Sequence, residues 1–480
     1  MILCGHMILA RSYRTVLLLL VLAGSSLPGP SKAQETSPAP PDTVVVTDIM
    51  IRGNRVTRER IILRELLVDI GDTIPAGSMY DLLERSRQNL VNTALFHTVN
   101  VMPLYLDPRH VIIEVTVSER WYLWPSVSLE LADPNFNTWW QTKDLSRINY
   151  GLYLYKYNFR GQNETIYVMS QFGYTQQYAL RYRIPYIDKG QRWGATIGGA
   201  YLQQEEVTAG TKNNERLLVS RPFTINRREQ LADLELSLRP SHDVRHYWRF
   251  GFNQATITDT ITQVAEDYFD GDKTRTRFLS LGYSIVWDTR DLRIFPKRGH
   301  FAELRVDRYG LALLDIASPD VTTFYLGLKR WFQLSQHLTL AASFRGKATW
   351  GTPPYYVQRG LGYSDIVRGY EYYVVDGEHY ILGRANLIIP IFKPRVTRVE
   401  PIPIEAFRTV YFALYLNVYT DLGRVWDDRY AEMNFLANRW MNGHGVGLDL
   451  VTSYDQVVRG EYSLNGLGEH GFFLHFTQPF

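Results

Sequence analysis

The sequence from Trp121 to the C-terminus, about 360 residues, consists of segments in which apolar and polar side chains alternate. The segment 301–309, for example, sets Ala302, Leu304 and Val306 against Glu303, Arg305 and Asp307. Successive side chains of a β-strand point to opposite faces, so each segment predicts a strand with one apolar and one polar face. Three charges on one face suit water better than a packed core. The pattern therefore predicts strands that lie between lipid and a hydrated lumen.

We count roughly sixteen such segments, each near the length of about ten residues that crosses a bilayer as a tilted strand. An even number returns the chain to the side of the membrane where it began. The prediction is an all-β transmembrane barrel of about 16 antiparallel strands over residues 120–480, preceded by a small α+β domain. Three long polar or glycine-rich stretches are expected to be extracellular loops, namely 204–230, 258–274 and 351–379.

The last ten residues, 471–480, continue the alternation and end on an aromatic side chain. One face of this expected strand is apolar and consists of Phe472, Leu474, Phe476 and Phe480. The arrangement resembles the terminal signal strand of bacterial outer-membrane barrels, although Gln478 stands where an apolar residue is usual. Taken alone, these residues also fit the last strand of a soluble sheet.

The overall composition agrees with a barrel and excludes some other classes of protein. Mean hydropathy is only −0.21 although aromatic residues make up 14%, which suits a barrel because half of each strand faces water. The net charge is +3 and no basic stripe is interleaved with aromatic residues, so we expect no nucleic-acid partner. After the N-terminal region, no apolar run approaches the roughly eighteen residues of a transmembrane helix.

The N-terminal region predicts export from the cytoplasm. Two arginines precede an apolar stretch at 16–27 and a small-residue site ends at Ala33, so residues 1–33 are expected to be a signal peptide. Residues 34–43 form a proline-rich linker. The only cysteine is Cys4, so the mature chain is expected to lack disulfides and thiol chemistry. The expected location is the outer membrane of a Gram-negative-type bacterium, with the N-terminal domain in the periplasm.

Residues 44–119 predict a compact α+β domain with elements in the order β-α-α-β-β. Thr57 is placed to cap the first helix and Ser78 to open the second. This order, with Gly53-Asn54 after the first strand, resembles a POTRA domain. The resemblance implies a periplasmic partner or client that pairs with an edge strand, as β-augmentation allows. A plain folding unit or spacer is the alternative.

Five short motifs follow one another in the second part of the chain. Val367-Arg368-Gly369-Tyr370 lies in the long stretch 351–379, and Asp421 and Gly423 belong to the strand end 419–426. The other three are Asn158-Phe159-Arg160-Gly161, Ile184-Pro185-Tyr186 and Asp288-Thr289-Arg290-Asp291. Together they resemble the outer-membrane protein assembly factor superfamily (BamA/TamA-like, bacterial surface antigen family) with one POTRA-like domain. The principal assembly factor of that family carries several such domains, so the resemblance is firmer for the barrel than for one activity.

The resemblance implies that the loop bearing Arg368 folds back into the barrel, where Arg368 meets Asp421 on the lumen wall. Alternation independently places Asp421 on the polar face of its strand. A guanidinium can bind a carboxylate through two parallel hydrogen bonds, which lysine cannot do. In a wet lumen we expect this pair to be partly hydrated.

The expected function is to assist insertion, assembly or translocation of proteins at the outer membrane by strand pairing at a weak seam between the first and last strands. The expected partners are outer-membrane lipids and unfolded or nascent outer-membrane client proteins. A passive channel or receptor barrel of the same fold is the alternative. No enzyme motif is present and the histidines lack metal-ligand spacing, so we expect no catalytic, cofactor-binding or metal site.

Overall fold

The computed structural model describes residues 42–131, 143, 145, 148–221, 224–269, 271–311, 318–402, 405–452, 454 and 456–476. The chain from Asp42 onwards forms one compact unit. The expected signal peptide, most of the expected linker, Gln478 and Phe480 lie outside the described residues. No helix in the described part is long and apolar enough to cross a membrane.

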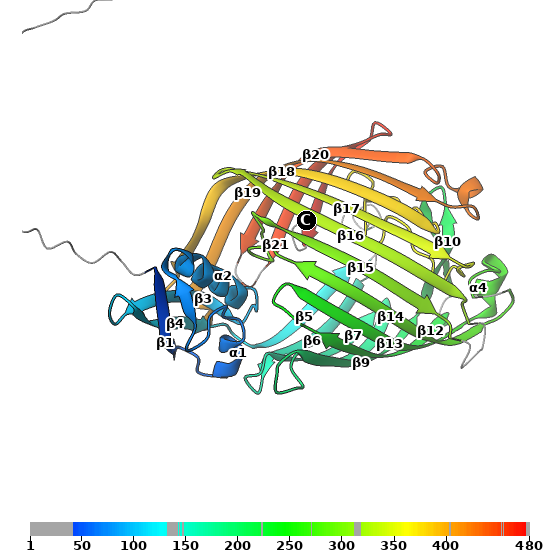
Figure 1. The fold of residues 1–480 in the computed structure, drawn as a ribbon. Helices are drawn as coiled ribbons and strands as arrows, with labels where there is room; N and C mark the ends of the chain where they lie inside the picture. The colour runs from blue at the N-terminus through cyan, green and yellow to red at the C-terminus, as the bar shows by residue number, and fades with distance from the viewer. Residues whose placement is uncertain are drawn as a thin grey trace, which may run out of the picture. The chain divides into compact units, whose positions relative to one another are not determined.

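The first described segment, residues 43–119, folds as a small α+β unit that we call the N-terminal module. Its sheet has the order β2-β1-β4-β3, with β1 and β4 parallel. The two helices pack on one face of the sheet, since their apolar residues share a core with alternate residues of β1 and β4 (Figure 1). The elements are β1 (Thr43–Arg52), α1 (Glu59–Leu63), β2 (Thr73–Pro75), the 3₁₀ turn η1 (Ala76–Ser78), α2 (Met79–Val91), β3 (Phe96–Tyr105) and β4 (His110–Glu119).

Thr57 does not cap α1, so this expectation from the sequence is wrong. The residue at the N-cap is Arg58, whose side chain makes no capping hydrogen bond. The Thr57 hydroxyl instead donates to Oε1 of Glu119 at 2.6 Å, and the Thr57 backbone N–H does the same. Thr57 thus joins the start of α1 to the end of β4. This tertiary contact outweighs the local preference of threonine for capping a helix. Ser78 does stand at the start of α2.

Among the described residues after the N-terminal module, sixteen strands form one antiparallel sheet, which confirms the strand number predicted from alternation. The sheet curls into a barrel (Figure 1). Its strands are β5 (Leu123–Leu131), β6 (Ile148–Phe159), β7 (Glu164–Gly173), β8 (Thr175–Ile184), β9 (Trp193–Gln204), β12 (Arg227–Leu238), β13 (Val244–Ile257), β14 (Arg275–Asp288), β15 (Gly299–Tyr309), β16 (Val321–Ser335), β17 (Leu338–Trp350), β18 (His379–Arg398), β19 (Thr409–Trp426), β20 (Trp440–Thr452), β21 (Val457–Asn465) and β22 (His470–Phe476). Short helical segments between strands are α4 (Asp259–Val264), α5 (Glu405–Arg408) and η3 (Ala431–Met433).

The stretch 204–230 is not the plain loop that we expected from the sequence, because part of it forms a hairpin. β10 (Glu206–Lys212) pairs with β11 (Glu215–Ser220) in antiparallel register. The turn residues Asn213 and Asn214 have φ of +53° and +61°. Two successive positive φ angles match the twist of a hairpin, and asparagine adopts them more readily than most residues.

The two faces of the strands differ as the alternation predicts. On β22, Phe472, Leu474 and Phe476 are 62%, 37% and 75% exposed, whereas Phe473 between them is 3% exposed. Exposed apolar side chains thus form the outer face, which agrees with a surface in contact with lipid.

The two ends of the strand order, β5 and β22, are not joined by backbone pairing among the described residues. Aromatic side chains nevertheless hold the start of β5 near the other end of the sheet. The ring of Trp124 lies 4.6 Å from that of Tyr454, just after β20, and 5.4 Å from that of Phe407, just before β19.

A buried carboxylate connects the N-terminal module to the turn after β12. Glu65 is 2% exposed, and its two oxygens accept hydrogen bonds from the guanidinium of Arg239 at 2.6 and 2.8 Å. Burial alone would raise the pKa of Glu65, but the charge and hydrogen bonds of Arg239, with a contribution from Arg64, lower that pKa to about 2. Glu65 is therefore ionised at neutral pH.

Candidate functional site: the infolded loop

The loop between β17 and β18, residues 351–378, folds against the inner side of the strands. Leu361 and Val375 form an isolated bridge that holds the two arms of the loop together. Val367 is 2% exposed and shares a buried apolar cluster with Leu382 of β18. The apolar residue of the sequence motif thus anchors the loop in place.

Arg368 and Asp421 meet in the structure through three hydrogen bonds. Nε and Nη2 of Arg368 donate to the two oxygens of Asp421 at 2.9 and 2.5 Å, and the Arg368 backbone N–H donates to Oδ2 at 3.1 Å. The guanidinium also lies over the ring of Tyr419, 3.7 Å from its centroid, and donates to Asn386 at 2.7 Å. Only arginine has a fork of donors that can make all these contacts at once.

The pair is more deeply buried than we expected for a wet lumen. The side chains of Arg368 and Asp421 are 6% and 0% exposed. Other charges surround them: Arg384 lies 3.5 Å from Asp421, and Glu461 of β21 lies 3.4 Å from Arg368. Loop packing removes water here, so each charge depends on its protein partners.

Three glycines allow the loop backbone to approach the strands closely. Gly369 has φ of +91°, a conformation that side-chain-bearing residues rarely adopt. A Cβ at Gly423 would lie 2.5 Å from a methyl carbon of Val367, and one at Gly443 of β20 would lie 1.8 Å from the carbonyl oxygen of Arg368. Gly423 belongs to the motif identified in the sequence, whereas Gly443 was not identified there.

The rest of the motif contacts the end of β21. The Tyr370 side chain is buried, and its hydroxyl accepts a hydrogen bond from the Gly466 N–H at 3.1 Å. The side-chain amide of Asn465 donates to the Gly369 carbonyl at 2.8 Å. The loop therefore binds the turn between the last two strands as well as β19.

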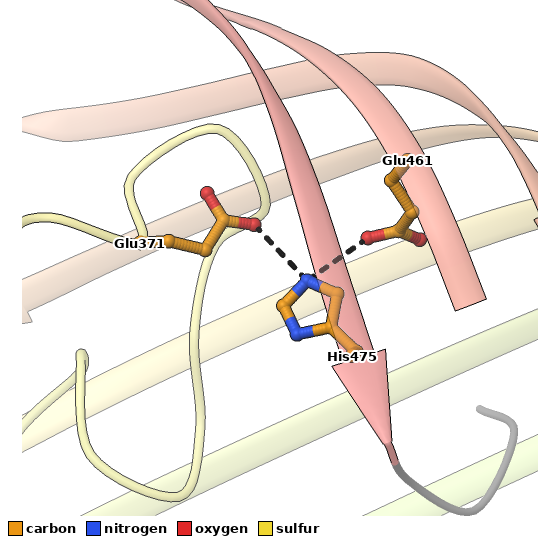
Figure 2. A group of neighbouring side chains, drawn as sticks. All are labelled: Glu371, Glu461 and His475. Carbon is orange, nitrogen blue, oxygen red and sulfur yellow. Dashed lines mark ion pairs between the residues drawn. The ribbon is translucent and has the colours of Figure 1, made fainter. Parts of the chain in front are cut away.

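Three further residues meet beside the motif and were not singled out as a group from the sequence. Glu371 from the loop, Glu461 from β21 and His475 from β22 point toward one another (Figure 2). Alternation already places Glu461 and His475 on inner faces, but nothing local in the sequence links them to Glu371. The terminal strand thus has lipid-facing residues, Phe472, Leu474 and Phe476, and an inner residue that reaches the loop.

A protein-family model described as the Omp85 superfamily domain matches residues 158–454, which include the loop motif and Asp421. The chain belongs to the Omp85 superfamily. This Omp85 chain is similar in structure to BamA from Haemophilus ducreyi lacking POTRA domains 1-3, with a TM-score of 0.52 and 14% identity over 90% of this chain and 83% of that one. It is also similar to CdiB from Escherichia coli, with a TM-score of 0.54 and 11% identity over 91% and 74%.

At these identities the two likenesses establish the fold alone. No curated protein sequence matches the chain significantly. Membership in the superfamily sets the location and the broad role: Omp85 proteins are non-enzymatic barrels of the Gram-negative outer membrane that take part in protein insertion or secretion. The prediction that the chain is not an enzyme agrees with this assignment.

Proposed function

We propose that this Omp85 protein inserts, assembles or translocates client proteins by exchanging strand pairing at the seam between β5 and β22. The observation that carries the proposal is that these two strands end the sheet without pairing to each other in the described part of the chain. Strand edges with free N–H and C=O groups are templates for another strand. A client strand would pair there and then enter the lipid beside the barrel.

Exchange of pairing is energetically feasible where simple opening is not. An unsatisfied backbone group in hydrocarbon costs several kcal/mol, so an open edge in the membrane is strongly unfavourable. If a client strand replaces one pairing with another, that cost does not arise. A seam without a backbone ladder among the described residues, where Trp124 of β5 contacts the rings of Tyr454 and Phe407 beside it, suits such an exchange.

The infolded loop is proposed to set the position of the strands next to the seam. Through Arg368 and Gly369 it contacts β19 at Asp421, β21 at Glu461 and the end of β21 at Asn465. With the strands on this side fixed, the outer edges of β22 and β5 would be the place where a client strand can pair.

The N-terminal module is proposed to be a POTRA-like domain that lies in the periplasm after removal of residues 1–33. Its β3 is an edge strand of ten residues with exposed apolar side chains at Met102, Leu104 and Tyr105. Such an edge suits β-augmentation by a client strand or a periplasmic partner.

A cysteine tether across the seam tests the proposal. With Cys4 replaced by serine, the chain has no other thiol, so pairs can be introduced at Val127 or Leu129 of β5 and Leu474 of β22. The matched control pair is Tyr462 and Phe472, which lie opposite each other on β21 and β22. Oxidation of a seam pair should stop delivery of outer-membrane proteins in cells depleted of the wild-type chain, and reductant should restore it.

The control disulfide should leave delivery unchanged. Full delivery through an oxidised seam would refute the strand-exchange mechanism. Conductance in planar bilayers distinguishes the alternative of a passive channel, since a porin-like barrel conducts steadily whereas a barrel filled by its loop conducts poorly.

A further inference from the structure

The cluster of Glu371, Glu461 and His475 brings three potential metal ligands to one point (Figure 2). One oxygen of each carboxylate is already held by the loop motif: the Gly369 N–H donates to Oε2 of Glu371 at 2.8 Å, and Nη1 of Arg368 donates to Oε1 of Glu461 at 3.4 Å. The second oxygen of each carboxylate faces Nε2 of His475. The motif thus orients both carboxylates toward the imidazole.

The two distances from the imidazole are longer than those of a strong, charge-assisted hydrogen bond. Nε2 of His475 lies 3.4 Å from Oε2 of Glu461 and 3.8 Å from Oε1 of Glu371. Glu461 is 1% exposed, and its Oε2 accepts no hydrogen bond from a described residue. Ligands of a tetrahedral zinc ion, each about 2.0–2.2 Å from the metal, lie about 3.3–3.6 Å from one another. The three ligand atoms are all within 4.8 Å of one another, so a small rotation of Glu371 would complete the fit.

The surrounding charges also favour a bound cation. The connected network holds the carboxylates of Glu371, Glu461, Asp421 and Asp449 and the guanidiniums of Arg368, Arg384 and Arg459. The four carboxylates exceed the three guanidiniums by one negative charge, which either a protonated His475 or a bound cation would balance. A histidine nitrogen with two carboxylate oxygens is a ligand set used for zinc, with a fourth position left for water.

We propose that Glu371, Glu461 and His475 bind a zinc-type divalent cation that ties the infolded loop to the last two strands. The sequence predicts no metal site, because its histidines lack metal-ligand spacing. The three ligands proposed here come from separate segments, so spacing along the chain does not reveal them. The inference does not depend on the proposed function: metal binding can be measured without any client protein.

The experiment uses the full mature chain, folded in detergent, with any affinity tag removed. The protein is stripped with a chelator, equilibrated with Zn²⁺ and desalted, and its metal content is measured by mass spectrometry. We expect about one zinc ion per wild-type chain, and at least a tenfold loss of affinity in His475→Ala and in Glu371→Gln. His470→Ala is the matched control, because His470 lies on the same strand but is exposed; it should bind zinc as the wild type does.

A second readout is protection of the loop 351–378 from protease, which zinc should increase in the wild type and in His470→Ala but not in the two site variants. Because Glu371 lies in the loop rather than in a strand, Glu371→Gln tests the site even if His475→Ala does not fold. Absence of retained zinc in the wild type, or equal retention by the wild type and both site variants, would overturn the proposal. If the wild type retains no zinc, a protonated His475 bridges the two carboxylates instead.

Discussion

At the scale of single residues, the function of Arg368 depends on its burial. The guanidinium of Arg368 is buried, so the hydrogen-bond network around it stabilises the loop only while every member of the network is present. Breaking a buried pair leaves the remaining charge without compensation, which costs far more than breaking an exposed pair.

Arg368→Ala and Asp421→Ala should each loosen the loop, since loss of one partner of a buried pair typically costs about 3–5 kcal/mol. The double variant should be little worse than either one, and Arg368→Lys should not restore the loop because lysine lacks the fork of donors. Limited proteolysis of 351–378 measures the effect. Arg398→Ala is the control, because its pair with Glu400 is 56% and 68% exposed and worth little. Additive losses in the double variant would contradict the pairing.

Gly443→Ala should displace the loop although alanine is small. The new Cβ would lie 1.8 Å from the carbonyl oxygen of Arg368, so the backbone of the motif must move. Amide hydrogen exchange in the loop should rise in this variant. Gly383→Ala on β18 should leave exchange unchanged, since its nearest neighbour would be 3.9 Å away. Equal exchange in the two variants would argue against this close approach.

At the scale of elements, one edge of β5 pairs with β6, whereas at its other edge the described residues provide aromatic contacts and no partner strand. Trp124→Ala removes contacts with Tyr454 and Phe407, each worth about 0.5–1.5 kcal/mol beyond burial. We expect faster disulfide formation between cysteines at Leu129 and Leu474 as the seam becomes more mobile. Trp350→Ala, which removes an exposed tryptophan packed edge-to-face against Phe324 of the neighbouring strand, should leave the rate unchanged.

The contact between the N-terminal module and the turn after β12 should weaken in acid. The pKa of Glu65 in the folded protein, about 2, is below its ordinary value near 4.5. The ionised form is therefore favoured by folding, so its stabilisation is complete above about pH 4.5 and is lost as the pH falls towards 2. Hydrogen exchange in α1 should rise over that range in the wild type.

The variant Glu65→Gln should raise exchange in α1 already at neutral pH and remove most of its acid dependence. Glu84→Gln is the control, because Glu84 pairs with Arg87 on the surface of the same module and its side chain is 49% exposed. If the contact between the N-terminal module and the turn after β12 is lost between pH 6 and 7, a group other than Glu65 sets its pH dependence.

At the scale of the whole molecule, sixteen strands satisfy their backbone groups mainly by pairing with one another. Such a sheet in detergent unfolds only when many hydrogen bonds break together. The unheated protein should therefore migrate faster in gel electrophoresis than the boiled protein. Equal migration of both samples would contradict a stable barrel.

The barrel could be predicted from the sequence because alternation is a local property of each strand. The inward position of Asp421 and the outward position of Phe472 follow from the two-residue period alone. The strand number follows as well, since each strand carries its own pattern. The hairpin at Asn213 and Asn214 had a readable turn signal, whereas the role of Thr57 did not, because its partner Glu119 lies at the end of another element.

Which inward residues meet depends on the complete fold. Glu371, Glu461 and His475 come from a loop and two strands, and no spacing in the sequence links them. The depth of burial of Arg368 likewise depends on how the loop packs against Gly423 and Gly443. The sequence by itself determined which face of a strand each side chain occupies, because that depends on the strand alone. The folded chain determined the contacts among those side chains, because curling of the sheet and infolding of the loop bring distant segments together.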